Sequence, residues 1–332
     1  MKVKPAILVS GNLPSSVRKY LGKDFRVEYH AEDRPMPRGE LLRSLANKVG
    51  LLSMITDTVD EELFLLAPQL MMVANMAVGY NNIDVAAATR RGILVSNTPG
   101  VLTEATADLA FSLILATARR VVEGDRMVRS GDFRFWAPFL FLGREVSGKT
   151  LGIVGMGRIG QAVARRAAGF SMPVIYHRRT PLKKSLEKGL RATGVSFAQL
   201  LQEADFISLH VPLSPETTHL IGKQEFNMMK RTAILINTSR GPVVDEKELL
   251  TALQKGRIAG AGIDVYENEP AITSGLETMS QAVLLPHVGS ATLETRTRMA
   301  ELAAENLRAG LLGQRPPHLV NPQAFKKRKG FC

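Results

Sequence analysis

The chain has 332 residues, of which 45% are hydrophobic, 22% charged and 6% aromatic, with a formal net charge of +12. This length and composition predict two globular domains and exclude a disordered, collagen-like or low-complexity protein. The single cysteine, Cys332, is the last residue. It excludes a disulfide-stapled scaffold and favours a reducing, cytoplasmic location. The longest apolar stretch, 109–118, is about half of the ~20 residues that a membrane-spanning helix needs, so we expect no membrane segment.

The positive charge comes from 43 lysines and arginines against 31 acidic residues, and four of these cations lie at 326–329. We interpret this excess as a solvated basic surface and tail that promote solubility. The sequence lacks the Cys/His spacing of zinc fingers, the aromatic boxes of RNA-binding domains and arginine-rich helices. We therefore expect neither a nucleic-acid partner nor a metal site.

Strand-like apolar runs alternate with helix-like stretches along most of the chain, which is typical of α/β proteins with parallel sheets. In the first hundred residues, the expected strands cover 6–10, 50–55, 70–76 and 93–96. A helix is expected after Asp84, which is a good N-cap, and it should end at Gly92.

A long helix is expected over 104–120 with Thr103 as its cap, followed by an irregular aromatic stretch at 131–143. A second, more regular βα series starts at Thr150. Its strands are expected at 150–154, 174–176, 206–210, 233–237, 262–265 and 283–285. A last helix over 293–312 favours a discontinuous layout, in which it returns to pack on the first domain.

The first strand of the second series runs into Gly155-Met-Gly157-Arg-Ile-Gly160 and then into a helix. A Gly-x-Gly-x-x-Gly motif between a strand and a helix is the fingerprint of a dinucleotide-binding site. Gly155 would make the tight turn, Gly157 would admit the pyrophosphate, and Gly160 would let helix and strand pack closely. The helix N-terminus would then hold the anion.

The residues after the second strand of this series indicate which nicotinamide cofactor is used. NAD-specific sites place a carboxylate on the ribose ~20 residues after the glycines. Here no acidic residue occurs between Gly160 and Glu187, and Arg178, Arg179 and Thr180 stand in that region instead. Arginine offers bidentate donors to phosphate. We therefore predict a preference for NADP(H), with NAD(H) as an alternative.

Three later strand ends carry Arg240, Glu269 and His287. This set suits the reduction of a 2-oxo acid, which needs a hydride at carbon and a proton at oxygen. Arg240 would bind the carboxylate and polarise the carbonyl, and His287 would donate the proton. An adjacent carboxylate would favour the imidazolium form. From the residues alone, Glu267 is as good a candidate for this carboxylate as Glu269. The other five histidines are interpreted as structural: 30, 177, 210, 219 and 318.

Over nearly its whole length the sequence resembles the D-2-hydroxyacid dehydrogenase family, most closely its glyoxylate/hydroxypyruvate reductase branch. The resemblance depends on six segments: 77–84, 155–160, 211–213, 237–241, 262–270 and 286–290. It implies two Rossmann-like α/β domains with parallel sheets, one flavodoxin-like and substrate-binding and the other dinucleotide-binding, with the active site in a cleft between them. The substrate domain would comprise 1–102 and 291–332, and the NAD(P)-binding domain 103–290.

The resemblance also implies roles for individual residues. Arg240, Glu269 and His287 would be the catalytic trio, with Glu269 paired to the histidine. Val78 and Gly79 would hold the substrate carboxylate through backbone N–H groups, and Arg240, His287 and Trp136 would also contact the substrate. The cofactor would be bound by Gly155, Gly157, Arg158, Ile159, Gly160, Arg178, Arg179, Thr180, Val211, Pro212, Thr238, Ser239, Asp264, His287 and Gly289.

The same resemblance implies a homodimer that the long helix after Thr103 helps to form. Trp136 falls where related reductases extend a tryptophan to the partner's site, and simple interface packing is the alternative.

Two other functions stay open. One is the same chemistry on a bulkier 2-keto acid or another small anion. The other is a nucleotide-sensing corepressor, which would favour NAD(H) and is therefore disfavoured by Arg178 and Arg179.

Overall fold

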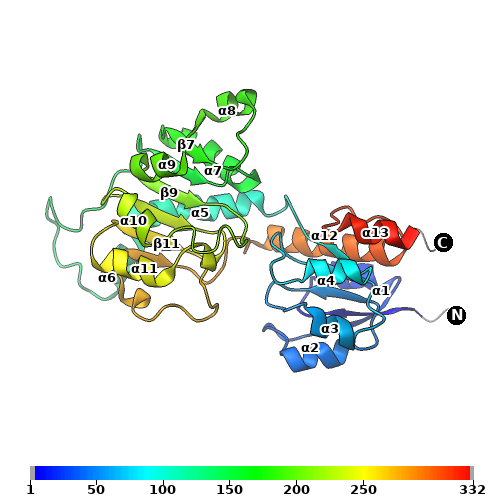
Figure 1. Cartoon of the computed structure of the whole chain (residues 1–332). Coiled ribbons are helices and arrows are strands. Elements are labelled where there is room, and N and C mark those ends of the chain that lie inside the picture. Colours follow the sequence, from blue (N-terminus) through cyan, green and yellow to red (C-terminus); the bar gives the residue numbers. More distant parts are fainter. Residues whose placement is uncertain (1–3, 330–332) are drawn as a thin grey trace. The chain divides into compact units, whose positions relative to one another are not determined.

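The computed structural model describes residues 4–329, and Cys332 therefore lies outside the described residues. The chain divides into two compact units (Figure 1). Unit 1 comprises Met1–Leu102 and Thr292–Cys332, and unit 2 comprises Thr103–Ala291. Ala291, which the sequence analysis assigned to the substrate domain, thus belongs to unit 2. The reason is local, because the Thr292 hydroxyl accepts a hydrogen bond from the Thr295 N–H at 3.1 Å and starts a new helix.

Unit 1 is built on a five-stranded sheet with the order β2-β1-β3-β4-β5, in which every pair is parallel. This is the flavodoxin-like order, with its switch point between β1 and β3. The strands are β1 (Ala6–Val9), β2 (Arg26–Tyr29), β3 (Gly50–Ser53), β4 (Met72–Asn75) and β5 (Leu94–Ser96).

Helices cover both faces of this sheet, which explains why its central strands are apolar on both sides. Ile7 and Val9 pack in one cluster with Ala303 and Leu307, whereas Leu8 packs in the other with Leu63. In Figure 1, α12 and α13 lie beside the strands of this unit. The helices are α1 (Ser15–Gly22), α2 (Arg38–Leu45), α3 (Glu61–Leu66), α4 (Val85–Arg90), α12 (Leu293–Leu311) and α13 (Pro322–Lys329).

Unit 2 contains a seven-stranded parallel sheet with the order β12-β11-β10-β9-β6-β7-β8. This is the Rossmann order with one additional strand, and the order reverses between β6 and β9. Its strands are β6 (Leu151–Val154), β7 (Val174–His177), β8 (Ala192–Gly194), β9 (Phe206–Leu209), β10 (Ile234–Asn237), β11 (Gly260–Ile263) and β12 (Ala282–Leu284).

The long helix α5 is buried along much of its length, with Ala110 and Ile114 fully inaccessible. None of the helices within 4–329 has the length and apolar composition needed to cross a lipid bilayer. The helices of unit 2 are α5 (Thr103–Ala118), α6 (Val121–Arg129), α7 (Arg158–Ala167), α8 (Lys184–Leu190), α9 (Phe197–Glu203), α10 (Lys223–Met228) and α11 (Glu246–Gln254). Three 3₁₀ turns complete it: η1 (Ala168–Phe170), η2 (Gly241–Val243) and η3 (Leu276–Thr278).

The two-sheet α/β architecture confirms the predicted fold class, but several elements differ from the prediction. The sequence analysis missed β2 and β8, which are short edge strands with several exposed residues and therefore lack a continuous apolar run. The strand expected at 262–265 lies at Gly260–Ile263, because Val265 stays buried after the strand has ended. The cap expected at Thr103 is wrong by one residue, since Thr103 is itself the first residue of α5.

Candidate active site

The glycine-rich loop between β6 and α7 lies at the point where the strand order of unit 2 reverses. Gly155 has a φ of 96°, and a Cβ atom there would lie 2.6 Å from the carbonyl oxygen of His210. A Cβ atom on Gly160 would lie 2.4 Å from the carbonyl oxygen of Gly155. Both positions therefore require glycine for the fold of the loop itself.

Gly157 differs from its neighbours, because a Cβ atom there would meet nothing within 4 Å. No contact with the residues that the structure describes therefore requires glycine at this position. The space lies at the N-terminus of α7, where Gly157 is the N-cap and Arg158 and Ile159 begin the first turn. A helix N-terminus with open space in front of it suits a pyrophosphate. The loop thus fits the phosphates of a dinucleotide.

The segment after β7 carries the predicted phosphate-binding residues beside this loop. His177 ends β7 and pairs with Val154 of β6, so Arg178 follows the strand adjacent to the glycines. Arg178 donates a hydrogen bond from Nη1 to the carbonyl oxygen of Met156 at 3.4 Å. Arg179 and Thr180 are exposed. Two cations therefore lie next to the candidate dinucleotide site.

His287 and Glu269 form a hydrogen-bonded pair beyond the carboxyl ends of β11 and β12. The Nδ1 atom of His287 lies 2.8 Å from Oε2 of Glu269, and their side chains are 31% and 35% exposed. The other carboxylate oxygen of Glu269 accepts the backbone N–H of Tyr266 at 3.0 Å. Burial raises the pKa of Glu269, but its hydrogen bond with His287 and the nearby charges outweigh this, and the net shift is downward. Glu269 is therefore ionised at neutral pH.

The structure separates the two glutamates that the residues alone did not distinguish. Glu267 accepts the backbone N–H of Glu246 at 2.8 Å, and its carboxylate lies 3.2 Å from Nε2 of His219. It therefore has partners of its own on another part of unit 2. Glu269 is the carboxylate that contacts His287.

Arg240 follows β10 and is held by the backbone around it. Its Nη1 donates to the carbonyl oxygen of Ser239 at 2.8 Å, and its own carbonyl accepts from the side-chain amide of Asn237 at 3.0 Å. A Cβ atom on the next residue, Gly241, would lie 1.8 Å from the backbone carbon of Tyr266. Burial lowers the pKa of Arg240, and the charge of Glu269 opposes that shift. Arginine remains cationic under these conditions.

Sequence reasoning missed Asn237, the last residue of β10, which organises the segment before Arg240. Its Oδ1 accepts both the N–H and the hydroxyl of Ser239, at 3.0 and 2.8 Å. The only signal in the sequence is an asparagine at the end of a buried strand. The hydroxyl of Thr238 is buried and has no hydrogen-bond partner among residues 4–329, so it is a candidate to bind a ligand.

Asp264 holds the backbone that follows His287. Its two carboxylate oxygens accept the N–H groups of Val288 and Gly289, each at 2.8 Å. Burial raises the pKa of Asp264, and these two hydrogen bonds act against that increase. His287 itself has a φ of 55°, an unusual conformation for a residue with a side chain. The turn is therefore held in place by a buried carboxylate. Val211 and Pro212 follow β9 on the same edge of the sheet.

In unit 1, the loop after β4 carries the predicted carboxylate-binding residues Val78 and Gly79. Among the residues that the structure describes, none accepts a hydrogen bond from either of their backbone N–H groups. Trp136 belongs to unit 2, where it is 77% exposed in the irregular segment after α6.

The chain is similar to known proteins in both sequence and fold. Residues 111–289 match the NAD-binding domain of the D-isomer specific 2-hydroxyacid dehydrogenases. The glyoxylate reductase of Thermococcus litoralis is 52% identical over 96% of this chain and 97% of its own length. A crystal structure of a protein from Thermus thermophilus is 46% identical and has a TM-score of 0.89 over 95% of this chain and 99% of its own.

A third relative has been crystallised with ligands. It is an NADPH-dependent glyoxylate/hydroxypyruvate reductase from Sinorhizobium meliloti, in complex with NADP and malonate. It is 34% identical, with a TM-score of 0.86 over 97% of this chain and 98% of its own. Because of these similarities and this fold, the chain belongs to the D-isomer specific 2-hydroxyacid dehydrogenase family, whose members are NAD(P)-dependent oxidoreductases that act on CH–OH groups.

Proposed function

We propose that this enzyme reduces glyoxylate and hydroxypyruvate to the corresponding 2-hydroxy acids with NADPH. The observation that carries the proposal is the Glu269–His287 pair, with Nδ1 and Oε2 at 2.8 Å, at the sheet edge that also presents Arg240. Relatives of similar length are glyoxylate reductases, which supports a small 2-oxo acid as substrate.

The bound nicotinamide would supply the hydride, and the residues of this chain would supply the proton and the orientation. Because Nδ1 of His287 faces Glu269, Nε2 is the ring nitrogen left to donate a proton to the substrate's carbonyl oxygen. The ionised Glu269 holds Nδ1 of the ring and fixes the orientation of the ring. Arg240 would bind the substrate by charge-assisted hydrogen bonds and polarise its carbonyl. The backbone N–H groups of Val78 and Gly79 would bind the substrate carboxylate.

The same proposal assigns the cofactor to unit 2. Gly155, Gly157 and Gly160 would admit the pyrophosphate at the N-terminus of α7. Arg178, Arg179 and Thr180 would bind the 2′-phosphate of NADPH, and the Sinorhizobium relative in complex with NADP supports this choice. The remaining predicted cofactor contacts are Arg158, Ile159, Val211, Pro212, Thr238, Ser239, Asp264, His287 and Gly289.

The experiment that tests this function is a steady-state assay of NADPH oxidation with a panel of 2-oxo acids, repeated with NADH. We expect the highest kcat/KM with glyoxylate or hydroxypyruvate and with NADPH. A higher kcat/KM for a bulkier 2-keto acid would assign that acid as the substrate instead, and a higher kcat/KM with NADH than with NADPH would refute the cofactor preference. Absence of turnover with every 2-oxo acid would refute the reductase.

We also propose that the enzyme is a homodimer. The segment after α6 exposes Phe135 (66%), Trp136 (77%) and Phe139 (87%), and α6 itself exposes Val128 (63%). Exposed apolar clusters of this kind mark interaction surfaces. Light scattering coupled to gel filtration should give twice the mass of the chain, 36.3 kDa. A monomer at micromolar concentration would refute the dimer. A dimer whose KM is unaffected by Trp136→Ala would limit Trp136 to interface packing.

A further inference from the structure

Three successive carbonyl groups in the loop after β4 are held by donors within unit 1. The carbonyl of Ala77 accepts the N–H of Thr98 at 2.9 Å. That of Val78 accepts the side-chain amide of Asn97 at 2.8 Å, and that of Gly79 accepts the side-chain amide of Asn75 at 2.9 Å. Three successive carbonyls therefore point toward the protein framework.

This arrangement determines the direction of the N–H groups. In a trans peptide unit the C=O and N–H bonds point in opposite directions, and the unit is planar. The carbonyl of Ala77 shares its unit with the N–H of Val78, and the carbonyl of Val78 shares its unit with the N–H of Gly79. Holding these carbonyls on the framework side directs both N–H groups away from it. Successive N–H groups that point the same way form an anion-binding concavity.

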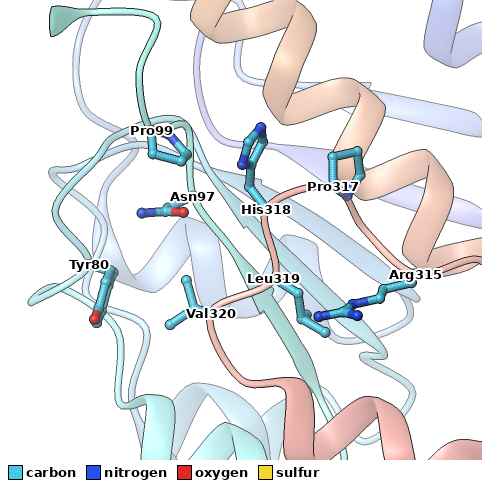
Figure 2. A pocket seen from close by; sticks show the side chains of 8 residues that line it. All are labelled: Tyr80, Asn97, Pro99, Arg315, Pro317, His318, Leu319 and Val320. Carbon is cyan, nitrogen blue, oxygen red and sulfur yellow. The ribbon is translucent and has the colours of Figure 1, made fainter. Parts of the chain in front are cut away.

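The two asparagines are themselves firmly anchored. Asn75 is fully buried, and its Oδ1 accepts the hydroxyl of Ser53 at 3.1 Å. The backbone of Asn97 donates to the carbonyl of His318 at 3.3 Å and accepts the side-chain amide of Asn306 at 3.1 Å. Figure 2 shows Asn97 between Tyr80 and His318 among the residues that line a surface pocket of this unit.

We propose that Asn97 and Asn75 are positioning residues, which orient the peptide units of the 77–80 loop so that the N–H groups of Val78 and Gly79 bind the substrate carboxylate. This inference rests on the proposed function, and it names the side chains that make the loop an anion site. Both asparagines are neutral, so they exert this control without adding a charge beside the substrate. An asparagine is suited to this task because its amide nitrogen donates while its oxygen remains available as an acceptor.

The test compares Asn97→Ala with Asn321→Ala. Asn321 is a matched control, because it is 2% exposed and its amide also ties β5 to neighbouring segments. It accepts the N–H of Val95 at 2.8 Å and donates to the carbonyl of Ile93 at 2.9 Å, but it does not contact the 77–80 loop. Both substitutions should lower Tm. A purely structural role for Asn97 therefore predicts the same kinetic result for both variants.

We expect Asn97→Ala to raise KM for glyoxylate about 10- to 100-fold, the range for losing aligned hydrogen bonds to a charged group, with kcat changed less than threefold. Asn321→Ala should leave KM unchanged. Asn97→Asp, which places an acceptor opposite the Val78 carbonyl, should raise KM at least as much, and Asn75→Ala should act in the same direction. An unchanged KM in Asn97→Ala, or an equal rise in both Ala variants, would overturn the proposal.

Binding of oxamate, a carboxylate analogue of a 2-oxo acid, separates this inference from the proposed function. Its Kd is measured by calorimetry with NADPH present and needs no turnover. A wild-type protein that binds oxamate but reduces no 2-oxo acid would refute the reductase. The positioning role of Asn97 would then be supported if Asn97→Ala raised the Kd for oxamate at least tenfold while Asn321→Ala left it unchanged. Failure of the wild-type protein to bind oxamate would overturn the inference as well.

Discussion

The two parallel sheets of this enzyme present different chemistry at their carboxyl ends. In unit 1 the ends of β3, β4 and β5 carry the neutral side chains of Ser53, Asn75 and Asn97, whose hydrogen bonds go to one another and to backbone carbonyls. In unit 2 the strand ends lead to charged or titratable groups, among them Arg240 and His287. We propose that the first edge orients backbone dipoles and that the second supplies cations and a proton donor.

This difference shows how one architecture serves two tasks. Neutral amides hold a fixed geometry whatever the pH, which suits recognition of a carboxylate that is always ionised in the physiological range. The pKa of a charged group depends on its charged neighbours, as the pKa of Glu269 depends on His287. General acid catalysis requires groups whose pKa is adjusted in this way. Substitutions of His287 and of the arginines after β7 should therefore affect kcat or cofactor choice, whereas those at the edge of unit 1 should affect KM.

The largest expected effect is that of His287→Ala. Losing the proton donor should lower kcat by about 10²- to 10⁴-fold while KM for glyoxylate changes little. Steady-state kinetics with saturating NADPH measure this effect, and calorimetry of NADPH binding separates it from any loss of the cofactor contact that is also predicted for His287. A variant with wild-type kcat would remove His287 from the role of proton donor.

The double substitution Arg178→Ala and Arg179→Ala should change cofactor choice. Loss of the charge-assisted hydrogen bonds to the 2′-phosphate should lower kcat/KM for NADPH about 10- to 100-fold and leave that for NADH nearly unchanged. Arg257→Ala removes an exposed cation elsewhere in unit 2 and controls for long-range attraction of the anionic cofactor. An equal loss of kcat/KM with both cofactors would mean that the two arginines do not bind the 2′-phosphate.

The glycine-rich loop offers a sharper contrast inside unit 2. Gly157→Ala should leave Tm within about 1 °C of wild type, because the new Cβ atom would meet nothing within 4 Å. The same substitution should weaken NADPH binding about tenfold. Gly160→Ala should lower Tm, because its Cβ atom would lie 2.4 Å from the Gly155 carbonyl oxygen. Thermal scans and calorimetry distinguish the two. Unimpaired NADPH binding in Gly157→Ala would place the pyrophosphate elsewhere.

The smallest effect concerns His210, which follows β9 and whose Nε2 lies 2.9 Å from the Ser208 hydroxyl. Burial lowers the pKa of His210 to about 4. The unfolded chain, with an ordinary pKa near 6.5, then binds a proton that the folded chain does not. The free energy of unfolding should therefore fall as the pH drops from about 6.5 to about 4, by roughly 1–3 kcal/mol from this residue.

Urea denaturation of the wild type and His210→Gln at pH 7 and pH 4.5 measures that contribution. The variant should lose less stability between the two pH values than the wild type does. An identical loss in both proteins would mean that His210 is accessible to protons in the folded state.

The sequence alone was sufficient to predict the α/β fold, because strand, glycine loop and helix follow one another in a fixed order around Gly155 and Gly160. It did not reveal β2 or β8, because an edge strand with several exposed residues has no continuous apolar run. Local patterns are reliable where both faces of a strand are buried, as in the centre of each sheet.

The candidate site was predictable to the extent that its residues follow strands. Arg240 and His287 can be recognised as candidates because each follows a predicted strand, and their roles stay predictions. The choice between Glu267 and Glu269 could not be made from the residues, since two carboxylates two positions apart differ only in the direction that the folded loop gives them. Asn97 was missed for a related reason. A side chain that holds a backbone carbonyl 19 residues away leaves no pattern in the sequence.

The most direct test of the whole account is a crystal structure of the enzyme with NADP and oxamate. We expect the oxamate carboxylate on the N–H groups of Val78 and Gly79, with its carbonyl oxygen about 3 Å from Nε2 of His287 and within reach of Arg240. Oxamate bound away from that loop, or His287 turned from it with Glu269 no longer its partner, would contradict the central claim.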